Sequence, residues 1–181
     1  MKWYVALLRG INVGGRNSLP MDELTTLLEE LGLTEVRTYI QSGNVLFRAD
    51  EIDEAMIASQ VREVIKKTKG FQPDVLVFSL EKLVASAKAN PFPEGEHEPS
   101  RLHLSFAAEN PSEADLDLLN GLKAESENFK LIGDVLYLHA PDGIGRSKLA
   151  SSIEKALGVP STMRNWRTVT KLLELASNST S

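Results

Sequence analysis

Two segments rich in glycine carry arginine where a predicted strand gives way to a predicted helix, and both could hold an anion. They cover residues 9–17 and 142–149. Glycine lets backbone N–H groups approach a ligand, and the start of a helix has a partial positive charge that favours anions. Arginine adds a planar guanidinium that can bind phosphate or carboxylate through two hydrogen bonds. The pattern therefore indicates anion binding.

The first segment is longer than the roughly two to six residues usual between a strand and a helix, and long loops are more often functional. The alternative is that its glycines only permit a tortuous turn. Neither G-x-G-x-x-G nor the Walker spacing is present, so the common nucleotide-binding fingerprints do not apply. Its candidate ligand-binding residues are Arg9, Gly10, Asn12, Gly14, Gly15 and Arg16.

The second segment contributes Gly145, Arg146, Ser147 and Lys148. Free N–H groups at the helix start and the Ser147 hydroxyl could bind an anion, with the two cations beside them. The order Gly-Arg-Ser-Lys differs from that of a P-loop, in which Lys precedes Ser or Thr. The alternative here is plain capping of the helix by Ser147.

Two further segments supply weaker candidates. A predicted hairpin turn offers Gln41, Ser42 and Asn44, although turn chemistry alone explains most of this composition. On a predicted final helix, three cations would share one surface and repel one another unless an anion or an acidic neighbour offsets them. Alternatively, the tryptophan of that segment anchors the helix to the core. The candidates of this segment are Arg164, Asn165, Trp166, Arg167 and Lys171.

The composition of the 181 residues excludes several kinds of chemistry. There is no cysteine and there are three histidines, which removes disulfides, thiolate nucleophiles and cysteine zinc sites. We therefore expect no metal site. No Ser–His–Asp set or carboxylate pair stands out, so catalytic residues and cofactors stay unknown, and enzyme activity is left open.

The net charge of −5 is unevenly distributed, with −8 before residue 142 and +3 from there to the end. Chance could produce this imbalance. Otherwise, a basic patch on an acidic protein suggests a focused anion site rather than general coating by nucleic acid. No apolar run reaches the roughly 18 residues of a membrane span, and no signal peptide is evident. We expect a cytoplasmic protein without a membrane partner.

The elements that must position these segments follow the order β-α-β-β-α-β in residues 1–79, which is the ferredoxin-like arrangement. Helical spacing of apolar residues begins at Met21 and ends at Gly32. A connecting helix and a linker then occupy residues 80–100. The four predicted strands of the first unit cover residues 3–8, 36–40, 45–47 and 75–78.

Residues 101–181 nearly repeat the pattern, but no closing strand is evident. We expect a helix over 111–122 capped by Asn110, another over 147–157 and a final helix over 164–176. The predicted strands cover 101–106, 129–132 and 135–139. The expected fold class is thus α+β, with two ferredoxin-like (α–β plait) halves. The second half would be incomplete and would carry a C-terminal helical extension.

Three hypotheses for function follow. The leading one is binding of a phosphate-bearing or other anionic small molecule or nucleotide. The second is a module for single-stranded nucleic acid, in which His103, Tyr137 and His139 would stack bases, although RNP signatures are missing. These three side chains would project opposite the leucine face, which is formed by Leu102, Leu104 and Phe106. In the third, the motif residues are purely structural and hold the two halves together.

The four candidate segments together resemble an uncharacterised bacterial family, domain of unknown function 1697. The resemblance runs to about Ala176. It implies a fold of α–β plaits, and it implies no established activity, substrate or catalytic residue. The matching motifs are LRGINVGG at 8–15, TYIQSGNV at 38–45, GRSKL at 145–149 and TMRNWRTV at 162–169.

Overall fold

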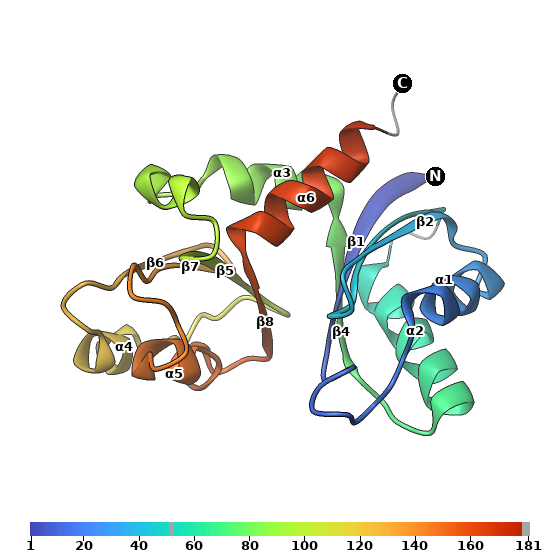
Figure 1. Cartoon of the computed structure of the whole chain (residues 1–181), viewed down its shortest axis with the longest axis horizontal. Coiled ribbons are helices and arrows are strands. Elements are labelled where there is room, and N and C mark those ends of the chain that lie inside the picture. The colour runs from blue at the N-terminus through green and yellow to red at the C-terminus, as the bar shows by residue number, and fades with distance from the viewer. Residues whose placement is uncertain (51–52, 179–181) are drawn as a thin grey trace. The chain divides into compact units, whose positions relative to one another are not determined.

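The computed structural model describes residues 1–50 and 53–178. These residues form a mixed α+β fold with two four-stranded antiparallel sheets and six α-helices (Figure 1). The elements are β1 (Lys2–Arg9), α1 (Met21–Glu30), β2 (Thr34–Tyr39), β3 (Asn44–Ala49), α2 (Glu54–Lys69), β4 (Asp74–Ser79), α3 (Leu80–Lys88), a 3₁₀ helix (Pro93–His97), β5 (Leu102–Ala107), α4 (Leu116–Leu122), β6 (Asn128–Ile132), β7 (Val135–His139), α5 (Lys148–Leu157), β8 (Ser161–Asn165) and α6 (Trp166–Ser177).

The chain divides into two compact units. The first unit contains Met1–Ala85 together with Thr170–Ser181, and the second contains Ser86–Val169. The first is therefore discontinuous in sequence, because most of the last helix counts with it. The sequence had placed that helix with the second half.

In the first unit the strand order is β2-β3-β1-β4, and α1 and α2 cover one face of the sheet (Figure 1). Strand alternation puts Tyr4, Ala6 and Leu8 of β1 on this face, where they join the core with apolar residues of both helices. Helix α2 begins where Asp53 accepts hydrogen bonds from two backbone N–H groups, and it ends at Gly70 with a φ of 78°.

The end of α6 is attached to the same sheet through Arg37 of β2. Arg37 Nη1 donates to the carbonyl oxygen of Leu175 at 3.0 Å, and the guanidinium also lies 6.0 Å from the Trp3 ring. A cation at the last carbonyls of a helix is favourable because the helix dipole is negative there. The contact fixes the last turns of α6 to β2.

In the second unit the strand order is β6-β7-β5-β8, and α4 and α5 cover one face (Figure 1). Leu136 and Leu138 of β7 point to this face and pack with Leu119 of α4 and Ile153 of α5. The core of this unit is therefore built from the helical and strand periodicities that the sequence displays.

Two expectations for the second unit are wrong. Residues Ser161–Asn165 form β8, which pairs with β5, so the sheet has its fourth strand and the half is not incomplete. The sequence does not indicate this strand because its buried residues Ser161 and Thr162 are polar, which hides the usual alternation. Helix α4 begins at Leu116 after Asp115, whose carboxylate accepts from Leu118 N–H at 2.9 Å, and not after Asn110.

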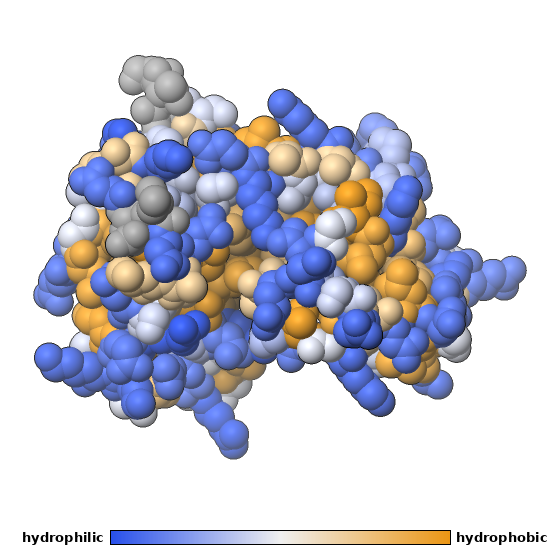
Figure 2. Space-filling model, turned by 180° about the vertical axis from the view of Figure 1, so that it is seen from behind, coloured by the Kyte–Doolittle hydropathy of each residue, from blue (hydrophilic) through white to orange (hydrophobic). Residues whose placement is uncertain are grey.

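The face drawn in Figure 2 is mostly polar. Figure 2 shows hydrophilic side chains over much of one face, with hydrophobic side chains in smaller patches between them. Within residues 1–50 and 53–178, no helix combines the length and hydropathy needed to span a membrane. The exposed large hydrophobic residues are Met1, Val13, Ile40, Met56 and Leu116.

Candidate functional site

The start of α5 presents free backbone donors. The Ser147 hydroxyl caps the helix by accepting from Ala150 N–H at 3.0 Å, and the Ser147 carbonyl accepts from Ser151 N–H. Among the described residues, the N–H groups of Lys148 and Leu149 donate to no other protein atom. The Lys148 N–H is therefore available to an anion, as is usual for the first turn of a helix, whereas Leu149 is fully buried.

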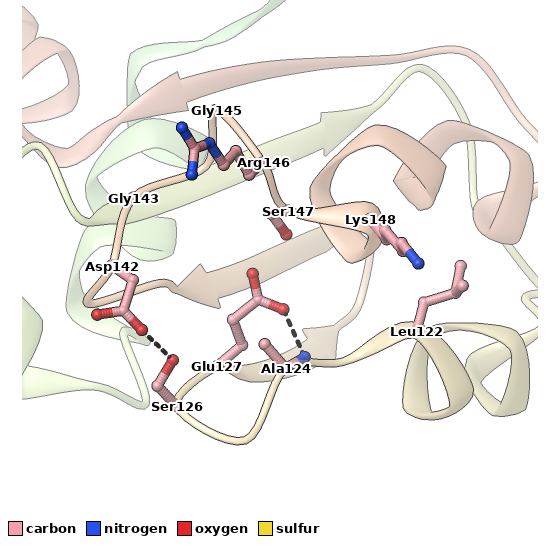
Figure 3. A pocket seen from close by; sticks show the side chains of 10 residues that line it. All are labelled: Leu122, Ala124, Ser126, Glu127, Asp142, Gly143, Gly145, Arg146, Ser147 and Lys148. Carbon is pink, nitrogen blue, oxygen red and sulfur yellow. Dashed lines mark hydrogen bonds between the residues drawn. The ribbon is translucent and has the colours of Figure 1, made fainter.

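A cavity of about 640 Å³ opens beside this helix start (Figure 3). Its walls are the end of α4, the loop from α4 to β6 and the loop from β7 to α5. Volumes of about 300–1,000 Å³ are typical of small-molecule sites. The lining residues are Leu122, Ala124, Ser126, Glu127, Asp142, Gly143, Gly145, Arg146, Ser147 and Lys148.

Two cations line the cavity without a carboxylate partner. Arg146 and Lys148 are exposed, and neither lies within 4.0 Å of an acidic group in the described part of the chain. Unpaired cations next to free helix N–H groups produce a positive potential. The arrangement can hold a phosphate or a carboxylate.

A buried carboxylate, Glu127, faces the same cavity. Glu127 is only 4% exposed, and its Oε2 accepts a hydrogen bond from Ala124 N–H at 2.9 Å. Oε1 accepts from no donor among residues 1–50 and 53–178, and Figure 3 shows the carboxylate directed into the space between the two loops. Since no described protein donor occupies it, this oxygen can accept a hydrogen bond from a molecule in the cavity.

A hydrogen bond joins the two loops. The Ser126 hydroxyl donates to Asp142 Oδ2 at 2.6 Å (Figure 3). Lys123 Nζ donates to the Glu127 carbonyl at 2.8 Å and holds the first loop. In the second loop, Gly143 has a φ of 86°, and a Cβ there would collide with the Arg101 guanidinium. The Ser126–Asp142 and Lys123–Glu127 bonds thus connect the two loops and hold the backbone at Glu127.

All four residues that the sequence selected from this segment line the cavity: Gly145, Arg146, Ser147 and Lys148. Their role in binding stays a prediction. Sequence reasoning missed Glu127 and Ser126, which lie in an unremarkable acidic loop. Nothing in the sequence shows that Glu127 is buried while Glu125 beside it is exposed.

In the first unit, the Asn12 amide bridges two segments. Its Nδ2 donates to the carbonyl oxygens of Leu19 and Gln41, each at 2.8 Å, and its Oδ1 accepts from Leu19 N–H at 2.7 Å. Asn12 adopts a left-handed φ of 51°, which asparagine tolerates better than most residues. The side chain is thus used in joining the 9–17 loop to the 40–44 turn.

The tip of the 9–17 loop is a tight turn. Val13 and Arg16 form an isolated bridge, and the glycines between them, Gly14 and Gly15, both have positive φ. Arg16 is exposed, and none of the described carboxylates lies within ion-pair distance of it. At the start of the loop, Arg9 Nη2 lies 2.8 Å from Asp74 Oδ2, and Gly10 accepts from the Asn17 amide.

The 40–44 turn is closely packed. Gly43 has a φ of 83°, and a Cβ there would lie 2.7 Å from Leu8 Cβ. The buried Asn44 amide donates to the Tyr39 carbonyl and to the Ser42 hydroxyl, each at 3.0 Å. Of the candidates here, Ser42 and Asn44 bond to each other, whereas the side chain of Gln41 is exposed.

The last segment differs from the expected helical surface. Arg164 lies on β8, where Nη1 donates to the Met163 carbonyl at 3.0 Å, so it does not share a helix face with Arg167 and Lys171. Asn165 caps α6, because its Oδ1 accepts from Thr168 N–H at 3.0 Å.

The other residues of this segment lie on α6. Trp166 is 7% exposed and Arg167 is exposed. Lys171 pairs with Glu174 at 2.9 Å. Arg167 and Lys171 therefore lie on α6 as expected, but Arg164 does not. Lys171 has an acidic partner, Glu174, on the same helix.

The expected base-stacking face does not form. Tyr137 pairs with Leu104 and His139 with Leu102, so both lie on the leucine face, whereas His103 pairs with Leu138 on the opposite face. All three are buried. Residues divided between two faces and closed to solvent cannot stack successive bases.

Burial perturbs two of these side chains. It lowers the pKa of the His103 imidazole from the usual 6.5, and His103 Nδ1 has no hydrogen-bond partner among the described residues. Burial raises the pKa of Tyr137 to about 12, so the phenol stays protonated and donates to the Ser86 carbonyl at 2.7 Å. Both groups are therefore neutral and structural near pH 7.

The candidate residues belong to different units. Residues 9–17 and 41–44 lie in the first unit, and Gly145 to Lys148 in the second. A concavity shared by all four segments stays a prediction. Within the described ranges, no cluster of three or more His, Asp or Glu could hold a metal ion.

Comparison with known proteins gives a family and a structural relative. A family model described as "Protein of unknown function (DUF1697)" matches residues 1–137, which confirms the resemblance over that range; the 145–149 and 162–169 motifs lie beyond it. The fold is similar to the solved structure of a conserved bacterial protein, SP0830, from Streptococcus pneumoniae. The TM-score is 0.68 at 25% identity, covering 96% of this chain and 98% of that one. No curated protein matches the sequence.

Proposed function

Because the chain belongs to the DUF1697 family, whose description names no activity, we propose a function from the geometry of the cavity in the second unit. The protein binds a small molecule with a phosphate or similar anionic group at the start of α5. The observation that carries this proposal is the combination of the free Lys148 N–H group with the unpaired side chains of Arg146 and Lys148.

Several contacts contribute to the free energy of anion binding. A helix start favours an anion by about 0.3–1 kcal/mol, and hydrogen bonds to charged groups contribute about 1.5–3 kcal/mol each. Arg146 can bind two oxygens of one phosphate, and Lys148 supplies a second charge. The cavity is concave, which shields these contacts from solvent better than a flat surface would.

The test is isothermal titration of wild-type protein with ribose 5-phosphate, alongside Arg146→Ala and Lys148→Ala. We expect each substitution to weaken binding about tenfold or more, as loss of a charge-assisted hydrogen bond does. The matched control is Lys155→Ala, since Lys155 lies exposed on the same helix outside the cavity. Absence of binding by the wild type, or equal loss in the control, would refute the proposal.

For the candidate motifs of the first unit, at residues 9–17 and 41–44, we propose a structural role. The hydrogen bonds of Asn12 and Asn44 and the packing of Gly43 support it, because they occupy the groups that a ligand would use. We also propose that each unit is ferredoxin-like. The strand orders β2-β3-β1-β4 and β6-β7-β5-β8 support this, with two helices on one face of each sheet.

A further inference from the structure

The charges that line the cavity cancel formally. Arg146 and Lys148 contribute two positive charges, and Glu127 and Asp142 contribute two negative ones. The free N–H groups of α5 add a partial positive charge. A single phosphate therefore meets a favourable potential at the helix start, whereas a chain of phosphates would extend towards the two carboxylates and be repelled.

One oxygen of the Glu127 carboxylate can accept a hydrogen bond from a ligand. Glu127 is 4% exposed, its Oε2 is occupied by Ala124 N–H, and its Oε1 faces the cavity with no donor among the described residues (Figure 3). A phosphate oxygen cannot satisfy it, because both groups accept hydrogen bonds and carry negative charge. A hydroxyl group can. A ligand that contacts Oε1 would therefore present a hydrogen-bond donor, such as a hydroxyl, besides its phosphate.

The cavity is larger than a phosphate group alone requires. About 640 Å³ is in the range of sites for whole small molecules, and the phosphate itself needs only the part next to α5. Glu127 comes from the loop between α4 and β6, on the other wall from Arg146. A molecule that reaches both walls must have a body attached to its phosphate.

From these three observations we propose that the cavity selects a phosphate monoester with a hydroxyl-bearing body, such as a sugar phosphate or nucleoside monophosphate, over inorganic phosphate and over polyphosphates. This selectivity rests on the proposed function. Glu127 is its determinant: the carboxylate accepts the hydroxyl and disfavours additional phosphate groups.

The experiment compares four probes by isothermal titration: inorganic phosphate, ribose 5-phosphate, AMP and ATP. For the wild type we expect ribose 5-phosphate to bind at least tenfold more tightly than inorganic phosphate, as one charge-assisted hydrogen bond allows. We also expect AMP to bind more tightly than ATP. In Glu127→Gln the preference for ribose 5-phosphate over phosphate should fall about tenfold.

Two design features keep the result clear. Glutamine retains a carbonyl oxygen for Ala124 N–H, and the ratio of two affinities within one variant does not depend on the fraction folded. The control is Glu125→Gln, because Glu125 is exposed in the same loop and does not line the cavity.

The outcomes distinguish a failure of the proposed selectivity from a failure of the proposed anion site. If inorganic phosphate binds as tightly as ribose 5-phosphate, or Glu127→Gln keeps the preference, the selectivity is refuted. When phosphate binding still depends on Arg146 in that case, the anion site itself stands. If no probe binds, both are refuted together.

Discussion

The Ser126 hydroxyl and the Asp142 carboxylate meet at 2.6 Å, and this hydrogen bond joins the two loops that form the cavity. Hydroxyl-to-carboxylate bonds of this length are among the stronger ones in proteins. The loops carry Glu127 and Arg146, so the bond links the two segments from which these side chains line the cavity.

Replacing Ser126 with alanine should loosen both loops. We expect faster amide hydrogen exchange over residues 124–127 and 142–147, and ribose 5-phosphate binding weaker by about threefold to tenfold. Exchange mass spectrometry and titration measure the two effects. Ser112→Ala is the control, since Ser112 is exposed outside the cavity. Unchanged exchange in both loops would contradict the role assigned to the bond.

Replacing Asn12 with alanine should destabilise the first unit by about 2–4 kcal/mol, because three hydrogen bonds are lost and backbone groups of Leu19 and Gln41 lose their partners. Asn17→Ala removes one side-chain bond, to Gly10, and should cost about 1 kcal/mol. Denaturant unfolding of the two variants gives the comparison. Equal losses of unfolding free energy in the two variants would contradict the larger contribution assigned to the hydrogen bonds of Asn12.

Replacing Gly43 with alanine should be more damaging than replacing Gly14. Both have positive φ, which costs an alanine about 1–2 kcal/mol. At Gly43 a Cβ would also lie 2.7 Å from Leu8 Cβ, whereas at Gly14 it would meet open space, so overpacking adds about 1–3 kcal/mol at Gly43 alone. The difference between the two free energies of unfolding isolates the clash, and a difference near zero would mean that β1 shifts freely.

The burial of His103 should make stability depend on pH. Its folded pKa lies below the unfolded value of 6.5, so the unfolded chain binds more protons as pH falls through that range. The contribution of neutral His103 is complete above pH 6.5 and is lost as pH falls from there towards the folded pKa. Denaturant unfolding at several pH values measures the loss of stability.

The matched variants for this test are His103→Gln and His97→Gln. The first removes the buried imidazole and should flatten the decline of stability below pH 6.5. The second removes an exposed imidazole and should leave the decline as it is in the wild type. An equally steep decline in His103→Gln would assign the effect to other groups.

Much of the architecture was predictable because apolar periodicity is a local signal. The spacing of Leu24, Leu27 and Leu28 marks α1, and the alternation of Tyr4, Ala6 and Leu8 marks the inner face of β1. Strand β8 was not predictable, since Ser161 and Thr162 are buried through pairing with a distant strand and not through hydrophobicity. Pairing over such separations leaves no local pattern.

The candidate site was predictable only in its cationic half. Glycine, arginine and serine at a helix start are recognisable in sequence, and Gly145 to Lys148 do line the cavity. The acidic half depends on which glutamate of the 124–127 loop turns inward. Glu127 accepts two hydrogen bonds within this loop, from Ala124 N–H and from Lys123 Nζ, and composition does not show them.

The Asn12 amide has a consequence for transplantation of these loops. Because one side chain satisfies backbone groups at Leu19 and at Gln41, neither segment is complete without the other. A designer who grafts residues 9–19 onto another sheet must carry the 40–44 turn as well. In related sequences, a change at the position of Asn12 should be accompanied by changes in the residues of the 40–44 turn.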